Sequence, residues 1–288
     1  MERNRWRWIG LACLLATALL LLLLSACTWG AKEPASAPVD PPRSEAPSSG
    51  ANPQPPAKPE APAAPETPES IDTVWGIDTA SIVDRPFFAC VKENFGFPAF
   101  VGRYLETKEG VSYGITKEEA AFLHEQGVKI LPIYNHFTDA TTYERGVAEA
   151  EQAIRLAGEA GIPEGVAIFA DVEPDYPVDA EFLRGWTATM LESSYVPGLY
   201  AVLVEASDSK ALSSYLRFAQ EHQKLASELA VWTSDVEVGI TTKANAPQAY
   251  APEAEVVTTV DVWQYGIDAE ACNIDTNLMR ASFMDYLW

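Results

Sequence analysis

Basic residues are scarce in this chain. Its 288 residues include 20 Lys and Arg against 41 Asp and Glu, which gives a formal net charge of −21 at pH 7. Nucleic-acid binding relies on Lys and Arg contacts to phosphates, so such an acidic chain is a poor nucleic-acid binder. The same charge repels anionic polymers and lipid headgroups. Affinity for such a polymer must therefore come from a site of complementary shape. Retention at a membrane must come from a covalently attached lipid.

Histidine and the common nucleotide-binding motifs are also scarce. The three histidines, His124, His136 and His222, fall in unrelated segments, and no Cys and His residues have metal-ligand spacing. The chain has neither a P-loop nor a Gly-rich dinucleotide turn. Serines near the expected strand ends lack the nucleophile-elbow pattern. We therefore predict no metal site and no cofactor.

Cysteine is limited to four residues. Cys13 lies in the apolar N-terminal stretch, and Cys27 follows it. The other two, Cys90 and Cys272, lie in the part of the chain that is expected to fold. A compartment outside the cytoplasm permits a disulfide between them. Two buried free thiols are at least as common, and the sequence leaves both alternatives open.

The N-terminal residues are typical of a secretory signal. Arginines precede an apolar stretch from Ile9 to Leu24, and small residues then precede Cys27. This arrangement matches the bacterial lipoprotein box, in which cleavage before the cysteine leaves a diacylglycerol on its thiol. We predict a signal peptide over residues 1–26 and lipidation of Cys27, which anchors the rest of the chain to the membrane outside the cytoplasm, at the cell surface. An ordinary signal peptide or an uncleaved membrane anchor are the alternatives.

Large apolar residues are almost absent between residues 31 and 70, where Pro and Ala dominate. Such a segment cannot bury a core and is predicted to be disordered. Its prolines favour an extended conformation, and at about 3.1 Å per residue the segment could reach on the order of 100 Å. We therefore predict a lipid-bearing linker over residues 27–70 and a single folded domain over residues 71–288.

Short apolar runs alternate with helical stretches from Ile71 onward, which predicts an α/β fold. Capping patterns predict helices that begin near Thr116, Thr141, Asp179 and Ser207. Repeated strand and helix units favour parallel pairing and closure into a TIM-type (β/α)8 barrel, with an open doubly wound sheet as the alternative. Eight strands are predicted, over residues 74–78, 100–105, 129–135, 166–172, 198–204, 229–233, 261–265 and 272–276.

Two carboxylates close the apolar run from Val166 to Ala170. Asp171 and Glu173 are two residues apart, so on a strand they face the same side, about 6 to 7 Å apart along the backbone. Like charges this close raise one pKa, so that one acid stays protonated while its neighbour stays ionised. Cleavage of a glycosidic bond needs this division of labour. The alternative is that Asp-x-Glu only ends a strand with solvated side chains.

Further polar residues fall at the expected carboxyl ends of other strands, which meet at one mouth in a barrel of parallel strands. Asp78 follows the first strand and Asp275 lies on the eighth. Aromatic rings together with carboxylates suit a sugar site. Taken singly, each aromatic is more often core packing than a ligand contact, and either aspartate could equally be a loop cap or a partner of Arg103. The candidate substrate-binding residues are Arg103, Tyr104, Tyr134, Tyr200, Trp232, Trp263, Gln264, Tyr265 and Asn277.

Several short motifs occur in an order that is known from one protein family. The motifs are Gly76–Ser81, Phe100–Tyr104, Thr116–Ala120, Lys129–Tyr134, Asp171–Glu173, Trp263–Tyr265 and Asn273–Asn277. In them the chain resembles the glycoside-hydrolase-like proteins of the domain of unknown function 1906 family. Those proteins in turn resemble the glycoside hydrolase family 25 muramidases. The resemblance spans nearly all of residues 72–280.

The resemblance implies a complete or modified β/α barrel that acts on peptidoglycan or a related amino-sugar polymer. It makes Glu173 the general acid and lets Asp171 orient the acetamido group of the substrate, while Asp78 and Asp275 shape the mouth. Muramidase-like hydrolysis of β-1,4 links would then proceed by internal attack of that acetamido group or by a carboxylate nucleophile. Thr79 follows Asp78 where muramidases usually have Val. We expect a monomer, and the competing hypothesis is a non-catalytic glycan-binding or scaffold module.

Overall fold

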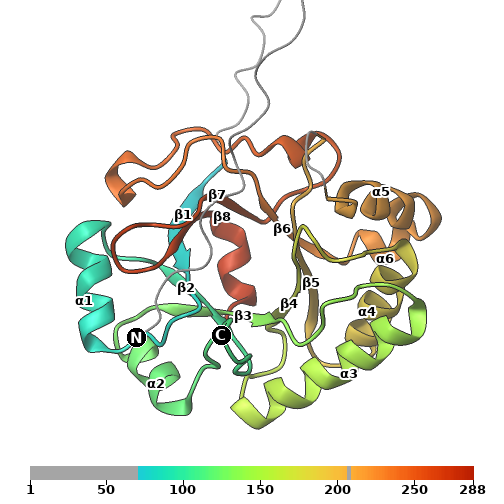
Figure 1. Cartoon of the computed structure of the whole chain (residues 1–288), viewed down its shortest axis with the longest axis horizontal. Helices are drawn as coiled ribbons and strands as arrows, with labels where there is room; N and C mark the ends of the chain where they lie inside the picture. Colours follow the sequence, from blue (N-terminus) through green and yellow to red (C-terminus); the bar gives the residue numbers. More distant parts are fainter. Residues whose placement is uncertain (1–70, 206–208) are drawn as a thin grey trace, which may run out of the picture. The chain divides into compact units, whose positions relative to one another are not determined.

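The computed structural model of the chain describes residues 71–205 and 209–288. Within them, eight strands pair in sequence order into a closed barrel (Figure 1). The predicted barrel is confirmed, and the open doubly wound sheet is wrong. The predictions for the signal peptide, for the lipidated Cys27 and for the linker fall outside the described residues.

Seven of the eight strands lie close to their predicted positions. Neighbours from β1 to β7 pair in parallel. Their residues are largely buried, as expected for parallel strands that are covered on both faces. The strands are β1 Thr73–Asp78, β2 Phe100–Tyr104, β3 Lys129–Tyr134, β4 Ala167–Val172, β5 Val196–Ala201, β6 Ala230–Ser234, β7 Val262–Gly266 and β8 Asp275–Arg280.

Strand β8 differs from the prediction in position and in direction. The predicted strand over 272–276 overlaps only its first residues, and β8 runs antiparallel to both β1 and β7. The cause is the short link between Gly266 and Asp275. A parallel crossover needs a dozen or more residues, whereas a short link can only reverse the chain. Within this link Asp268, Cys272 and Asn273 have positive φ, as tight reversals require.

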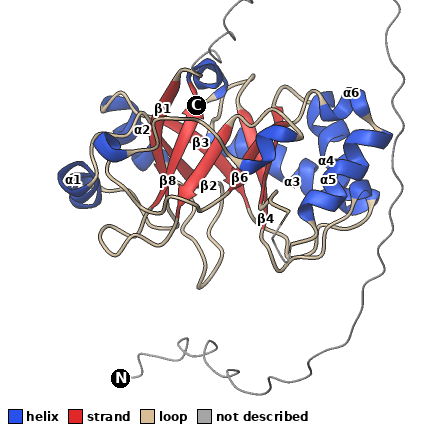
Figure 2. Cartoon of the chain, turned by 90° about the horizontal axis from the view of Figure 1, so that it is seen from above, coloured by secondary structure: helices blue, strands red, loops and turns tan. Residues whose placement is uncertain are grey.

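Helices cover much of the outer face of the barrel (Figure 2). They are α1 Arg85–Asn94, α2 Lys117–Glu125, α3 Tyr143–Ala160, α4 Ala180–Glu192, α5 Ala211–Glu221 and α6 Gln223–Ala226. Three 3-10 helices follow, η1 Lys243–Asn245, η2 Glu253–Val256 and η3 Ala281–Tyr286. In the described parts of the chain, no helix is both long enough and apolar enough to cross a membrane.

Side-chain caps decide where several of these helices begin. Thr116 and Asp179 accept hydrogen bonds from backbone N–H groups at the starts of α2 and α4, as predicted. The predicted cap at Thr141 is wrong by one residue, because Thr142 accepts the bond from the N–H of Arg145. The predicted cap at Ser207 falls outside the described residues, and α5 begins without a side-chain cap.

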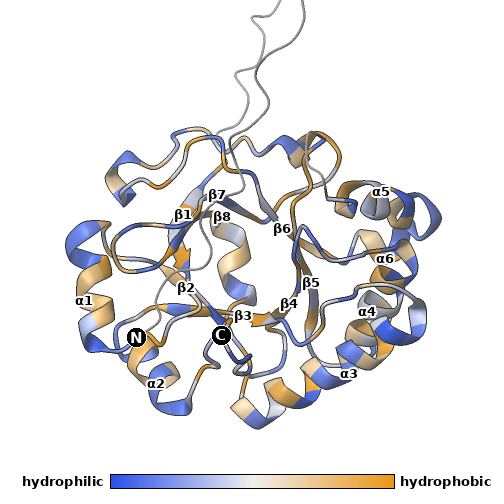
Figure 3. Cartoon of the chain, viewed as in Figure 1, coloured by the Kyte–Doolittle hydropathy of each residue, from blue (hydrophilic) through white to orange (hydrophobic). Residues whose placement is uncertain are grey.

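The apolar core has an inner part and an outer part. Inside the barrel, Leu131, Phe169 and Met279 belong to one buried cluster. Outside it, apolar faces of the helices pack on the strands, with Trp186 of α4 among the largest fully buried side chains. Figure 3 shows orange and blue residues on different faces of the same helices. Removal of this apolar surface from water is the main favourable contribution to folding.

The C-terminal segment closes one end of the barrel. Phe283 of η3 packs edge-on against Phe169, with ring centroids 6.0 Å apart. Trp288 and Ile130 exchange two backbone hydrogen bonds, of 3.0 and 2.9 Å, next to the start of β3. The chain itself therefore fills the barrel interior at the amino-terminal ends of the parallel strands.

The two cysteines of the folded part form a disulfide. Cys90 of α1 is bonded to Cys272 of the link between β7 and β8, with Cα atoms 5.8 Å apart. Of the two alternatives, free thiols are therefore wrong. The bond attaches the link that precedes β8 to a helix that is distant in sequence.

Candidate active site

A cavity of about 370 Å³ opens at the carboxyl ends of the strands. All four carboxylates that were predicted to act in catalysis line it. Two further acids, Asp235 and Asp268, line it as well, and no Lys or Arg of the described residues does so. The cavity is therefore strongly negative. Its acids are Asp78, Asp171, Glu173, Asp235, Asp268 and Asp275.

Two different strand directions bring Asp78 and Asp275 to the same mouth. Asp78 is the last residue of β1, and Asp275 is the first residue of the antiparallel β8. The two are directly paired across the ladder. Asp275 was expected at the carboxyl end of a parallel strand, and it instead reaches the mouth from the amino end of a reversed one.

Asp78 is held at the floor of the cavity by amides. Its Oδ2 accepts hydrogen bonds from Nδ2 of Asn277 at 2.7 Å and from Nε2 of Gln264 at 2.9 Å. The other atom of each amide is also engaged, because Trp232 Nε1 donates to Asn277 Oδ1 and the Tyr200 hydroxyl donates to Gln264 Oε1. This network fixes both amide orientations. Burial still raises the pKa of Asp78, against the lowering effect of the two amides.

Asp275 lies on the adjacent wall. The backbone N–H of Asp268 donates to its Oδ1 at 2.7 Å, and Gln264 Nε2 lies 3.5 Å from its Oδ2. Burial, followed by the charge of Asp78, raises the pKa of Asp275 to about 8. At neutral pH this carboxyl group therefore holds a proton much of the time.

Asp171 and Glu173 form the pair at the carboxyl end of β4. Asp171 is 4% exposed, and its carboxylate accepts no hydrogen bond from the described residues. Burial, followed by the charges of Glu173 and Asp78, raises its pKa well above the ordinary value. Burial and the charges of Asp175 and Asp78 also raise the pKa of Glu173, which is less enclosed. Burial and like charges thus favour the protonated form of each acid.

Lys108 was not predicted, and it is a cation that acts on this pair. Its charge lowers the pKa of both Asp171 and Glu173. Its Nζ donates to the carbonyl oxygens of Asn135 and Phe137, at 2.9 and 3.2 Å. The ammonium is therefore fixed to the backbone beside the mouth. Lys108 lies in an irregular link, where no sequence period indicates the direction of a side chain.

Three of the predicted aromatic residues line the cavity. Tyr104, Tyr200 and Trp232 do so, and the rings of the last two meet edge-on with centroids 4.6 Å apart. Burial, followed by the charges of Asp171, Asp78, Glu173 and Asp275, raises the pKa of Tyr104. Its hydroxyl therefore stays a neutral donor at the centre of the acidic wall. Rings of this kind can pack on the apolar face of a sugar.

Five predicted substrate contacts do not line the cavity, and three of them lie outside it because neighbouring residues on a strand face opposite sides. Arg103 precedes the inward Tyr104, and its Nε lies 2.6 Å from Glu119 of α2. Trp263 and Tyr265 flank the inward Gln264, and both belong to the outer core. These three side chains therefore hold the barrel in place from outside.

Tyr134 and Asn277 also have roles that differ from the predicted contact with substrate. The hydroxyl of Tyr134 donates to Glu149 of α3, and its ring packs near Trp186 of α4. Asn277 faces inward, yet it is completely buried and reaches the site only through its bond to Asp78. Asn277 is therefore a positioning residue.

Residues after β6 and β7 complete the wall, and most of them were not predicted. Asp235 and Val236 follow β6 directly, and Ile267 and Asp268 follow β7. The segment from 235 to 261 is interrupted by Gly239, Pro247 and Pro252, so its sequence shows no period. Their position directly after a predicted strand would have been the only usable signal for these residues.

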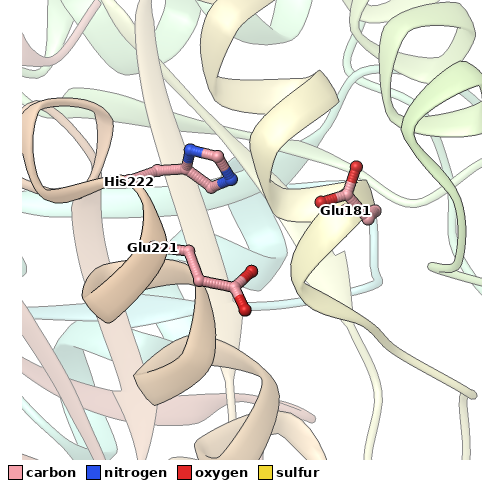
Figure 4. A group of neighbouring side chains, drawn as sticks. All are labelled: Glu181, Glu221 and His222. Atoms are coloured by element: carbon pink, nitrogen blue, oxygen red, sulfur yellow. The ribbon is translucent and has the colours of Figure 1, made fainter.

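One group of side chains in the described residues could meet the geometric needs of a metal ion, and it lies away from the cavity. Glu181, Glu221 and His222 present ligand atoms within 4.8 Å of one another (Figure 4). Both carboxylates already pair with an arginine of their own helix, Arg184 at 2.6 Å and Arg217 at 3.0 Å. We interpret the group as surface ion pairs that meet at the edge of α4 and α5.

Comparison with known proteins places the chain in a family. The model of the Rv2525c-like, glycoside hydrolase-like domain matches residues 97–279. The chain belongs to this family. The family expected from the sequence motifs is thereby confirmed. The matched range includes Asp171, Glu173 and Asp275, and Asp78 lies before it.

Solved structures include relatives of this glycoside hydrolase-like domain. A B. stearothermophilus protein described as uncharacterized shares 36% identity with a TM-score of 0.70, covering 75% of this chain and all of that one. The Mycobacterium tuberculosis Tat-secreted protein Rv2525c, in complex with HEPES, shares 17% with a TM-score of 0.46, over 72% and 95% of the two chains.

More distant neighbours include family 25 hydrolases. A family 25 glycosyl hydrolase from Bacillus anthracis shares 15% identity with a TM-score of 0.46, over 74% of this chain and 93% of that one. No curated protein matches the chain significantly. Fold and family are thus established, and the chemistry must be argued from the cavity.

Proposed function

We propose that the barrel hydrolyses β-1,4 glycosidic links in peptidoglycan or a related amino-sugar polymer. The observation that carries the proposal is the carboxyl pair of the buried Asp171 and the partly exposed Glu173, which shares a cavity with aromatic rings at the carboxyl ends of the strands. Two carboxyl groups with raised pKa values can divide the roles of acid and base. Membership in a glycoside hydrolase-like family supports the same reaction class.

Glu173 is the proposed general acid, because it is the less enclosed member of the pair. It gives its proton to the leaving oxygen as the bond from that oxygen to the anomeric carbon breaks, and it later takes a proton from the attacking water. The anomeric carbon gains its new bond from the acetamido oxygen of the substrate or from a carboxylate, and water then replaces that group. Asp171 orients the acetamido group in the first route.

Burial favours the protonated form of Asp171, so the proposed roles require that the substrate moves this proton. A donor or a positive charge beside Asp171 lowers the pKa of Asp171. The proton then resides on Glu173, where the leaving oxygen needs it. Substrate binding and preparation of the acid are therefore coupled in this proposal.

The rest of the chain fits an enzyme that is held near its polymer. We propose cleavage after residue 26, lipid attachment at Cys27, and a linker over residues 27–70 that carries a monomeric barrel outside the cytoplasm. Metabolic labelling with a palmitate analogue tests the lipid. Loss of the label in a Cys27→Ala variant is expected, and retained label would remove Cys27 from that role.

The Glu173→Gln variant tests the reaction. It removes the proton with almost no change of shape, and we expect release of reducing ends from purified cell wall to fall by about 100-fold or more. Glu192→Gln is the matched control, since Glu192 is an exposed carboxylate at the end of α4. Thermal denaturation checks that both variants fold. Unchanged release in Glu173→Gln would exclude Glu173 as the acid.

A glycan-binding module without turnover is the second candidate. The absence of basic lining residues favours it, because nothing in the described wall attracts an anionic polymer. Sedimentation with insoluble cell wall, run beside the reducing-end assay, separates the two candidates. Binding of the wild-type protein without any released product would select the binding module.

A further inference from the structure

The charge of the cavity exceeds what the proposed reaction uses. Hydrolysis requires two carboxyl groups, whereas six line the wall and no described Lys or Arg does. Lys108 makes no ion pair with any of them, because its ammonium is bonded to two backbone carbonyls and to the Tyr176 hydroxyl, although its charge lowers the pKa of Asp171 and Glu173. A neutral sugar would leave most of these acids without a cationic partner.

Asp171 is the member of this set that most clearly lacks a partner. Its carboxylate is almost completely buried, it lines the cavity, and no described residue donates a hydrogen bond to it. A buried charge without a partner is costly, so such a group is expected to meet a donor or a cation from a ligand. Asp78, whose charge acts on Asp171, is paired across the ladder with Asp275.

The wall is not arranged for a bare metal ion. Within the described residues, the one group of three acidic or His ligand atoms that come within 4.8 Å of one another is the surface group of Glu181. No three acids of the cavity therefore present ligand atoms close enough together to chelate one ion. An ammonium group on a larger, hydroxyl-rich ligand needs only one of these acids at hydrogen-bond distance, since the others act on its charge at longer range.

We propose that the cavity binds a hexosamine whose amino group is free rather than acetylated, with the ammonium against Asp171 and facing Asp78 and Asp275. This inference rests on the proposed function for the identity of the ligand as an amino sugar. The faces of the sugar ring pack on Tyr104 and Trp232, which line the same cavity.

The ammonium also acts on the proton of Asp171. A positive charge beside Asp171 draws the proton away from it and leaves Glu173 as the protonated acid. A free amine has no acyl oxygen for internal attack. A hexosamine of this kind at the reacting position therefore uses the carboxylate route.

Calorimetric titration with two tetrasaccharides tests the inference. One is a β-1,4 glucosamine tetramer, and the other is its fully N-acetylated form. The protein is the full chain with Glu173→Gln, so that neither ligand is cleaved. We expect the free-amine tetramer to bind at least about tenfold tighter at low ionic strength, and this advantage to shrink as salt is added. At a pH where the amines are protonated, the wild-type protein should release a proton on binding it, because the ammonium lowers the pKa of the facing Asp275, and the measured heat should then depend on the buffer.

Asp171→Asn in the same background should abolish the preference, and Asp175→Asn, which removes an exposed acid outside the cavity lining, should retain it. If Asp171→Asn does not fold, the proton release of the wild-type protein remains decisive. Equal or tighter binding of the acetylated tetramer would overturn the inference, as would preference for a lysine-bearing wall peptide over the free-amine tetramer.

The reducing-end assay keeps this inference separate from the proposed function. Cleavage of acetylated wall without preference for free amines supports the hydrolase and overturns the present inference. Tight binding of the free-amine tetramer without any cleavage supports the inference and overturns the hydrolase.

Discussion

The barrel is covered by helices on the side of β3, β4 and β5, whereas irregular links cover much of the side of β6, β7 and β8 (Figure 1). The helix side is stabilised by apolar packing of α3, α4 and α5 on the strands. On the link side, the described residues between β6 and β7 and between β7 and β8 form only 3-10 helices, turns and irregular segments. That side is held together by a disulfide and by individual hydrogen bonds instead.

The helix side includes a close contact between two backbones. Gly146 of α3 and Gly185 of α4 face each other's helix, and a Cβ added at Gly185 would lie 2.3 Å from the carbonyl oxygen of Tyr143. Glycine is therefore required there by space. This contact lies outside the barrel and does not touch the cavity.

The link side is held by a disulfide and by buried polar groups. Cys272 is bonded to Cys90 of α1, and the Thr79 hydroxyl donates to the carbonyl oxygen of Asn273. The guanidinium of Arg103 donates to the carbonyl oxygen of Thr79 at 2.8 Å. These bonds act on the residues that directly follow Asp78 and precede Asp275.

The cavity takes residues from both sides. Asp171 and Glu173 come from the helix side, and Asp78 and Asp275 come from the link side. Substitutions on the helix side should therefore lower the stability of the fold without changing the site. Substitutions on the link side should lower the stability and also change the geometry of the site.

Removal of the disulfide should have the largest effect. A Cys90→Ser, Cys272→Ser variant frees a loop of 182 residues in the unfolded chain, and we expect stability to fall by about 3 to 4 kcal/mol. Sugar binding should weaken as well, because the link that donates to Asp275 loses its attachment. Urea denaturation and calorimetry measure the two effects. Reductant should lower the stability of the wild-type protein and leave that of the variant unchanged. Unaltered sugar binding in the variant would show that the link between β7 and β8 does not support the site.

Gly185→Ala should have the next largest effect, without any change at the site. The new methyl group would meet the backbone of α3, and overpacking of this kind costs about 2 to 3 kcal/mol. Gly158→Ala on α3 is the control, because nothing lies within 4 Å of its added Cβ, and it should stabilise by about 0.5 to 1 kcal/mol. Thermal denaturation gives both values. Weaker sugar binding by folded Gly185→Ala would contradict the separation of the two sides.

The pH dependence of stability should show a smaller effect from the link side. Asp275 has a pKa of about 8 in the folded protein against 3.8 ordinarily, so between these values the folded state holds a proton that the unfolded state has released. Its contribution to stability is therefore full below about pH 4 and is lost as the pH rises toward about 8. Urea denaturation across this range measures the slope. Asp275→Asn should flatten it, and an identical slope in the variant would assign the effect to another group.

Much of the fold could be predicted because local spacing carries the information. Runs of buried apolar residues indicated eight strands, and the caps at Thr116 and Asp179 followed from hydrogen bonds within one turn. The convergence of Asp78, Asp171 and Glu173 followed from parallel strands that end at one mouth.

The direction of β8 could not be predicted from local spacing, because it depends on how the barrel closes against β1. Asp275 lines the mouth although its strand was predicted with the wrong position and the wrong direction. Closure of the barrel pairs Asp275 with Asp78, and this register places it there. Lys108 and the wall after β6 lie in links without a period, so no pattern indicated them.

The sequence by itself determined seven of the eight strands, the helix starts at Thr116 and Asp179 and the acidic character of the mouth, since each depends on neighbours within a few residues. The tertiary structure alone decided that Tyr104 faces the cavity while Arg103 faces Glu119, and that Cys90 meets Cys272. The reason is physical: the period of a strand separates its two faces, but only packing against distant segments decides which face is inside.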